Sequence, residues 1–156
     1  MIYLKWYIIS NGKKIISIKK HTVYIALGSN IGDKSKNLSS AIEEIKTLIG
    51  EVTEVSSFFE NEPQGFESNN IFVNACLICK TNLNPLATLK ELKNIEKKMG
   101  RKKTNEVYKD RIIDLDIIFF DKLIYKSEKL TIPHKEYKNR SFVLIPLKEL
   151  SPFLEK

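Results

Sequence analysis

The sequence predicts an α+β fold of the ferredoxin-like type, with the order βαββαβ, an antiparallel sheet, two helices on one face and extra C-terminal strands. Four apolar stretches have the composition of strands, and two segments have the 3.6-residue spacing of amphipathic helices. These six elements follow one another without repeats or linkers. A chain of 156 residues is long enough to bury the core of one such domain.

The first half of the chain supplies three strands and one helix. The predicted order is strand 23–27, turn 28–33, helix 35–49, strand 52–59, loop 60–70 and strand 71–80. The helix is expected to end at Gly50, because glycine readily adopts the left-handed conformation after a last helical turn. Gly28 to Ser35 superficially resembles a phosphate-binding loop, but its glycine spacing is too short and Asp33 separates Gly32 from Lys34. We interpret it as a strand-to-helix turn.

The second half completes the pattern. The predicted order is helix 85–99, polar loop 101–110, strand 114–120, a small pair of strands at 123–125 and 130–132, an irregular or short helical stretch at 133–140, and an apolar segment at 142–145. Asn84 and Pro85 form a typical helix start, and Gly100 a typical stop. With both helices on one face, the other face of the sheet is expected to be free to carry a site.

The positive charge is concentrated at the N-terminus. The net charge is +7, and residues 1–22 contain five lysines and no acidic residue, so the remainder is nearly balanced. This asymmetry predicts a basic arm or hairpin at 1–21, preceding a domain at 22–156. Asn11-Gly12 between two apolar stretches is typical of a hairpin turn. The balanced domain argues against a nucleic-acid partner.

Cys76 and Cys79 form a C-x-x-C pattern inside a predicted strand. Residues three apart on a strand face opposite sides, so these thiols are not expected to share a metal or form a disulfide. We interpret both as small core residues of a protein in a reducing, cytoplasmic compartment. No apolar run approaches the roughly 18 residues of a membrane-spanning helix, so no membrane partner is expected.

Asp114 and Asp116 lie two residues apart in an otherwise apolar strand, and therefore share one face. Two carboxylates so close are unfavourable unless a positive group lies beside them. One candidate is Mg²⁺, which is usually held by one or two carboxylates together with substrate phosphates. The alternative is that Arg111 and nearby lysines neutralise the pair.

Arginine is rare in this chain, which contains only Arg101, Arg111 and Arg140 among 26 basic residues. In a chain that otherwise uses lysine, the arginines are expected where a planar, bidentate group is needed for phosphate or carboxylate. Two of them lie on a basic loop that immediately precedes the aspartates. This loop is predicted to be either a lid over a triphosphate or a solvated loop.

Three other residues are candidates for binding. His134 follows a proline and precedes Arg140, so it either contacts phosphate or is structural. Asn74 lies within an apolar strand, where a buried amide needs partners, and Phe72 shares its face. Together they form either a stacking and hydrogen-bonding surface for a heterocycle or part of the core.

These segments resemble the 6-hydroxymethyl-7,8-dihydropterin pyrophosphokinase family of folate biosynthesis. The matching segments are 24–30, 55–58, 63–65, 72–75, 95–96, 100–101, 111–117, 130–134 and 138–140. The most specific of these are Arg-Ile-Ile-Asp-Leu-Asp-Ile at 111–117 and Pro-His followed by Asn-Arg at 133–140.

The resemblance implies Mg²⁺-dependent transfer of pyrophosphate from ATP to 6-hydroxymethyl-7,8-dihydropterin, with release of AMP, by a monomeric enzyme. It implies that Asp114 and Asp116 hold two Mg²⁺ ions and that Arg101 and Arg111 act with them in catalysis. The residues implied in nucleotide binding are Glu96, Lys103, Tyr108, Ile117, Lys129, Thr131, His134, Lys135 and Arg140. Those implied in pterin binding are Asn61, Pro63, Gln64, Phe72, Asn74 and Phe142.

Four positions depart from the family pattern, one of them Glu62, which stands where proline is common. Lys103 and Lys129 stand where arginine is common, and Tyr108 where tryptophan is common. Lysine retains the charge but not the bidentate geometry. Two other functions remain open: an RNA-binding ferredoxin-like module, which lacks its aromatic signature here, and an inactive nucleotide-binding relative.

Overall fold

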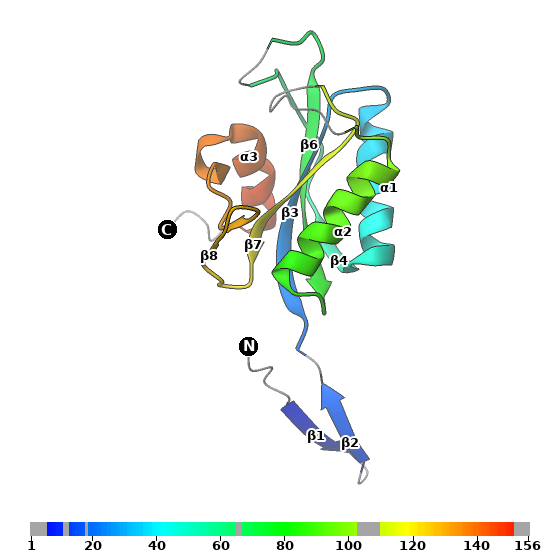
Figure 1. The fold of residues 1–156 in the computed structure, drawn as a ribbon, viewed down its shortest axis with the longest axis vertical. Helices are drawn as coiled ribbons and strands as arrows, with labels where there is room; N and C mark the ends of the chain where they lie inside the picture. The colour runs from blue at the N-terminus through cyan, green and yellow to red at the C-terminus, as the bar shows by residue number, and fades with distance from the viewer. Residues whose placement is uncertain (1–5, 11–12, 18, 65–66, 103–109, 152–156) are drawn as a thin grey trace.

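The structure is a computed structural model that describes residues 6–10, 13–17, 19–64, 67–102 and 110–151. Its central unit contains β3 (His21–Ser29), α1 (Lys34–Leu48), β4 (Gly50–Val55), β5 (Phe59–Asn61), β6 (Phe72–Thr81), α2 (Pro85–Lys98) and β7 (Asp114–Phe120). The strands pair antiparallel in the order β4-β6-β3-β7, and β5 also pairs with β6 (Figure 1). The predicted ferredoxin-like α+β fold is confirmed.

Both helices of this unit begin within one residue of the predicted start. The Asp33 side chain accepts a hydrogen bond from the backbone N–H of Lys36 at the start of α1. Asn84 does the same for Ala87 at the start of α2, where Pro85 occupies the first turn. These caps satisfy N–H groups that have no partner within a first helical turn. The segment from Gly28 to Ser35 is therefore a strand-to-helix turn.

The two helices cover one face of the sheet and form the main core (Figure 1). Alternate residues of each strand point into this core, including Ile25, Leu77 and Leu115, which are fully buried. The helices contribute Leu38 from α1 and Leu92 from α2. This arrangement leaves the intervening strand residues, among them Asp114 and Asp116, on the opposite face.

The opposite face is only partly free, which corrects the expectation of an uncovered surface. The apolar segment at 142–145 lies within a third helix, α3 (Ser141–Leu150), and this helix packs mainly on β6 and also on β5 (Figure 1). Val143 and Leu147 form a second apolar cluster with Cys76 and Ile118. The free part of this face therefore lies at one end of the sheet, beside Gly28, where β6 and β7 begin.

The predicted strand at 52–59 is divided into β4 and β5. The backbone N–H of Ser56 donates to the carbonyl oxygen of Cys76, and its hydroxyl accepts from the Cys76 N–H. The chain thus stays attached to β6 while it changes direction between the two strands. The later part β5, with Asn61, lies beside Phe72 and Asn74.

Smaller elements surround the central unit. The predicted pair of C-terminal strands is present as β8 (Tyr125–Lys126) and β9 (Thr131–Ile132), followed by the 3-10 helix η1 (Tyr137–Asn139). Near the N-terminus, β1 (Trp6–Ser10) and β2 (Lys13–Ser17) form a separate antiparallel pair (Figure 1). Of the arrangements left open for residues 1–21, this pairing corresponds to the hairpin.

The two cysteines behave as predicted from strand alternation. Cys79 belongs to the core beneath the helices and Cys76 to the cluster beneath α3, and both are free and buried. Burial raises the pKa of Cys76 to about 12 and that of Cys79 to about 11, with Glu51 adding to the second shift. Among the described residues, no helix has the length and apolar character needed to cross a bilayer.

Candidate functional site

The register of the sheet places the candidate residues in one row. Gly28 on β3 lies opposite Asn74 on β6 and opposite Asp114 on β7. Paired residues of neighbouring strands point to the same face, so the amide of Asn74 and the carboxylate of Asp114 flank Gly28. Two strand spacings separate them, which is about 10 Å.

This row forms the base of a cleft of about 580 Å³, a size typical of sites for small molecules. Its lining comes from the strands, from α2, from the segment after β9 and from the start of α3. The lining residues are Ala26, Leu27, Gly28, Asn61, Gln64, Phe72, Asn74, Lys93, Arg101, Arg111, Asp114, Asp116, His134, Lys135, Glu136, Asn139, Arg140, Phe142 and Val143.

Twelve of the residues singled out from the sequence line this cleft: Asn61, Gln64, Phe72, Asn74, Arg101, Arg111, Asp114, Asp116, His134, Lys135, Arg140 and Phe142. Five others do not line it: Pro63, Glu96, Ile117, Lys129 and Thr131. Ile117 belongs to the core beneath the helices. Lys103 and Tyr108 lie outside the residues that the structure describes.

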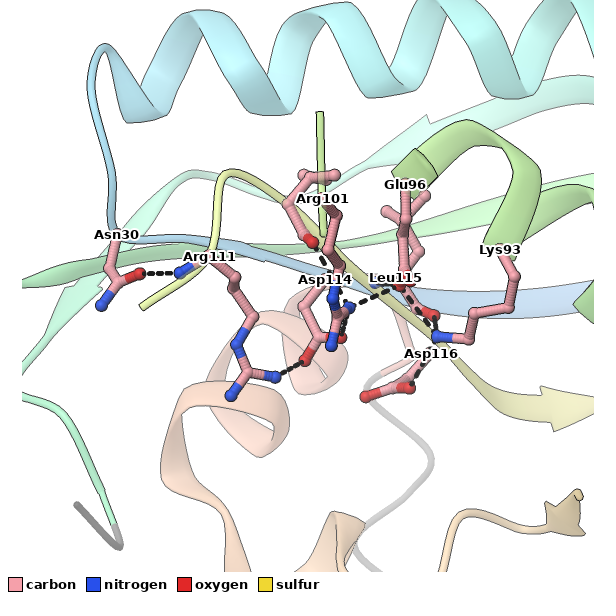
Figure 2. Close-up of polar contacts among 9 residues, drawn as sticks. Asn30, Lys93, Glu96, Arg101, Arg111, Asp114, Leu115 and Asp116 are labelled. Atoms are coloured by element: carbon pink, nitrogen blue, oxygen red, sulfur yellow. Dashed lines mark hydrogen bonds and ion pairs between the residues drawn. The ribbon is translucent and has the colours of Figure 1, made fainter. Parts of the chain in front are cut away.

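Asp114 is held by two arginines from different segments. Arg101 Nη1 lies 2.5 Å from one carboxylate oxygen, and Arg111 Nη1 lies 2.8 Å from the other (Figure 2). Burial opposes ionisation of this carboxyl, but the guanidinium groups of Arg111 and Arg101 outweigh it and hold its pKa below the usual range. Asp114 is therefore a carboxylate.

Asp116 lies in a different environment. Burial, and then repulsion from Asp114, raises the pKa of this carboxyl above its usual range. Lys93 Nζ lies 4.0 Å from one of its oxygens, at the limit of an ion pair, and the side chain remains 33 % exposed (Figure 2). A cation close to Asp116 would relieve this repulsion.

Glu96 lies beneath the cleft and organises two of its cations. One carboxylate oxygen is 2.8 Å from Lys93 Nζ and 2.9 Å from Arg101 Nη1, and it also accepts from the backbone N–H of Leu115 (Figure 2). Burial raises the pKa of Glu96, although Lys93 and Arg101 favour the charged form. Its carboxylate thus joins α2, the segment after it and β7.

Sequence reasoning did not identify Lys93. Ion pairs between a lysine and a glutamate three residues apart are common on helix surfaces, as between Glu43 and Lys46 of α1. The feature that distinguishes Lys93 is its position over β7, where it donates to the carbonyl oxygen of Leu115. That contact depends on how α2 packs on the sheet.

Gly28 was also missed as a site residue, because the sequence prediction placed it in the turn; it lies within β3, where a glycine marks close approach. A Cβ atom at Gly28 would lie 2.8 Å from Asn74 Oδ1. Asn74 is 4 % exposed and its Nδ2 donates to Asn61 Oδ1, so this amide is fixed in place. Gly28 therefore creates the space in which Asn74 presents its remaining polar atoms to the cleft.

His134 lies on the wall of the cleft after β9. Its backbone N–H donates to the Ile118 carbonyl oxygen, and its Nδ1 accepts from the Glu136 N–H. Burial lowers the pKa of His134, with Arg140 adding to the shift and Asp116 opposing it. A neutral ring that accepts at Nδ1 carries its proton on Nε2, which makes that atom a hydrogen-bond donor.

Comparison with known proteins agrees with this geometry. Residues 24–152 match the family model of 7,8-dihydro-6-hydroxymethylpterin-pyrophosphokinase (HPPK). A 2-amino-4-hydroxy-6-hydroxymethyldihydropteridine pyrophosphokinase of Porphyromonas gingivalis is 39% identical over 137 residues, covering 85% of this chain and 92% of that protein. The Bacillus subtilis protein of the same name is 41% identical over 135 residues, covering 85% and 80%.

Solved structures show the same fold. A Plasmodium falciparum HPPK-DHPS structure with pterin and p-hydroxybenzoate superposes with a TM-score of 0.69 at 19% sequence identity. The match covers 86% of this chain and 40% of that longer one. From the family model and the curated relatives, we conclude that this chain belongs to the 7,8-dihydro-6-hydroxymethylpterin-pyrophosphokinase family.

Proposed function

We propose that this chain transfers the pyrophosphoryl group of ATP to the hydroxymethyl oxygen of 6-hydroxymethyl-7,8-dihydropterin and releases AMP. One observation carries the proposal. A single cleft joins an aromatic and amide pair, Phe72 and Asn74, to the two aspartates, which basic side chains surround. A heterocycle and a polyphosphate need these two kinds of surface beside each other.

The proposed reaction forms one bond and breaks one. The pterin hydroxyl oxygen attacks the β-phosphorus of ATP, and the bond from that phosphorus to the α,β-bridging oxygen breaks. The bridging oxygen leaves with AMP, and the hydroxyl proton is released. Such a transfer depends chiefly on alignment of the reactants and on stabilisation of charge, so a covalent nucleophile is not required.

The pterin is proposed to occupy the β5–β6 end of the cleft. Phe72 on β6 and Phe142 on α3 line this end and offer aromatic surfaces for stacking. Asn74 is fixed by Asn61 and Gly28, so its free polar atoms can select the donor and acceptor pattern of a ring edge. Gln64 also lines this end.

The phosphates are proposed to lie along the β7 side, where positive groups gather. The basic side chains that line the cleft here are Arg101, Arg111, Lys93 and Arg140, together with His134. Arg101 and Arg111 already meet a carboxylate, and guanidinium groups also suit phosphate oxygens. Lys93 supplies a further charge close to Asp116.

The proposed cofactor is Mg²⁺, with two ions held by Asp114 and Asp116 as the resemblance implies. The donor set fits a hard cation, because both side chains offer carboxylate oxygens on one face of β7. Among the described residues no group of three metal-ligating side chains occurs, which suits an ion that completes its shell with phosphate and water. When bound, Mg²⁺ would neutralise phosphate charge and polarise the attacking hydroxyl.

The proposed partners are these two small molecules alone. One chain supplies both the aromatic end and the charged end of the cleft, so the proposed active unit is a monomer. Two free, buried cysteines are consistent with the proposed cytoplasmic location, where thiols stay reduced.

The direct test is product analysis with purified protein, MgATP and 6-hydroxymethyl-7,8-dihydropterin. We expect AMP and the pterin diphosphate in equal amounts, no ADP, loss of activity with EDTA, and recovery with added Mg²⁺. Release of ADP would contradict pyrophosphoryl transfer. MgATP binding without any AMP would instead identify an inactive relative.

Replacing Asp116 with asparagine tests its proposed role at the cation. We expect kcat to fall at least about 10²-fold to 10³-fold, because one key electrostatic contact is lost while the side-chain shape is kept. Asp121→Asn, at the end of the same strand, is the control and should retain turnover. Near wild-type turnover of a folded D116N protein would remove Asp116 from the mechanism.

Replacing Glu96 with glutamine tests its role as a positioning residue. We expect the free energy of unfolding to fall by about 1–3 kcal/mol, because the buried charge that joins Lys93, Arg101 and Leu115 is lost. Glu43→Gln is a matched control: its pair with Lys46 has the same spacing, but Glu43 is 70% exposed rather than 5%. Its effect should stay below about 0.5 kcal/mol in urea unfolding. Equal losses would refute the assignment.

Replacing Gly28 with alanine should raise the KM for the pterin by about tenfold, because the new methyl group displaces Asn74. The KM for MgATP should change little. Gly32→Ala is the control: Gly32 has a φ of +68 with no atom within 4 Å of an added Cβ, so stability falls without an effect on the pterin KM. An unchanged pterin KM in G28A would show that Asn74 does not read the pterin.

A further inference from the structure

Asp110 accepts hydrogen bonds from three side chains on two other segments of the chain. Its Oδ1 accepts from Asn30 Nδ2 at 2.7 Å and from Ser68 Oγ at 2.7 Å, and its Oδ2 accepts from Asn70 Nδ2 at 2.8 Å. Asn30 follows β3, whereas Ser68 and Asn70 precede β6. We call these four side chains the Asp110 cluster.

On one side, the Asp110 cluster fixes the backbone of Arg111. Asn30 is 2 % exposed, and its Oδ1 accepts from the Arg111 N–H at 2.7 Å (Figure 2). The backbone N–H of Asn30 in turn donates to the Arg111 carbonyl oxygen at 3.1 Å. The Arg111 side chain then reaches Asp114. The position of this guanidinium thus depends on Asn30, which Asp110 orients through its amide.

On the other side, the Asp110 cluster holds the chain that enters β6. The Ser68 hydroxyl donates to Asp110 and accepts from the Asn70 N–H at 3.1 Å, which forms a tight local turn. Asn70 is exposed, so its contact with Asp110 is the link that attaches it to the β7 side. Phe72 follows two residues later and lines the cleft.

We propose that Asp110 is a positioning residue that couples the pterin side of the cleft to the phosphate side. Through Asn70 and Ser68 it sets the path of the chain into Phe72, and through Asn30 it sets the Arg111 backbone. The expected kinetic effect rests on the proposed function, whereas the coupling itself rests on the hydrogen bonds alone.

The chemistry of the cluster explains why a carboxylate occupies this position. All three groups that reach Asp110 are donors, and an ionised carboxylate only accepts. These bonds hold the pKa of Asp110 below its usual range, with the Ser68 hydroxyl contributing most. An asparagine would lack the negative charge that strengthens all three hydrogen bonds.

The test uses D110N, N70D and the D110N/N70D double variant. D110N removes the negative charge that strengthens the three hydrogen bonds, and N70D places two carboxylates together, so each should raise the pterin KM by about fivefold or more. The double variant exchanges donor and acceptor and should return the pterin KM to within about twofold of the wild type. If Asp110 only stabilised the fold, the folded single variants would keep the wild-type pterin KM.

Amide hydrogen exchange supplies a readout that does not depend on the reaction. If the coupling is correct, N70D should speed amide exchange at residues 111–114. D110N should speed exchange both there and at residues 70–74. The double variant should restore the wild-type exchange rates. This holds even if the wild type forms no AMP, so failure of the proposed function can be told apart from failure of the coupling.

Glu149→Gln is the matched control. Glu149 also accepts hydrogen bonds from a connecting segment, through the Ser57 N–H and hydroxyl, but it lies outside the cleft. E149Q should leave the pterin KM and exchange at residues 111–114 within about twofold of the wild type. The proposal is overturned if D110N behaves like E149Q, if the double variant shows no rescue, or if N70D alters only its own segment.

Discussion

The carboxylate of Asp114 is the contact on which the rest of the cleft depends. It receives Arg101 from the end of α2 and Arg111 from the approach to β7, so it joins two segments that would otherwise repel each other. Glu96 supports the same arrangement from below by meeting Arg101 and Lys93. Positive charge is thus concentrated at one end of the sheet, and Lys93, Arg101 and Arg111 are each held by an acid that limits their movement.

This arrangement also reconciles the two interpretations of the aspartate pair. Arginines do neutralise Asp114, as the simpler interpretation requires. They do not neutralise Asp116, whose pKa is raised by burial and by its neighbour. The pair is therefore asymmetric, with one carboxylate satisfied by protein cations and one that favours an additional cation. A phosphate chain that accompanies a metal ion would bring acceptors for the arginines and positive charge for Asp116 at the same time.

The sequence predicted those features that depend on local pattern. Alternation along a strand was sufficient to place Asp114 with Asp116 and Phe72 with Asn74 on one face, and to separate Cys76 from Cys79. The start of α2 at Asn84 followed from capping chemistry, whereas the Asp33 cap of α1 was not predicted. Helix α3 was harder to predict, because Pro146 lies within it and its apolar residues show no clear boundary from a strand. Its presence decides how much of the second face remains open.

The residues that local pattern could not reveal are those whose role depends on register or on contacts between distant segments. Gly28 matters because β3 aligns it with Asn74 on one side and Asp114 on the other, which no single strand discloses. Lys93 is an ordinary helix-surface lysine until α2 packs over β7. Asp110 looks like one more loop residue, yet its partners lie 40 to 80 positions away. Side chains that join the two halves of a cleft must come from segments distant in sequence, so they are the ones that only a three-dimensional structure can identify.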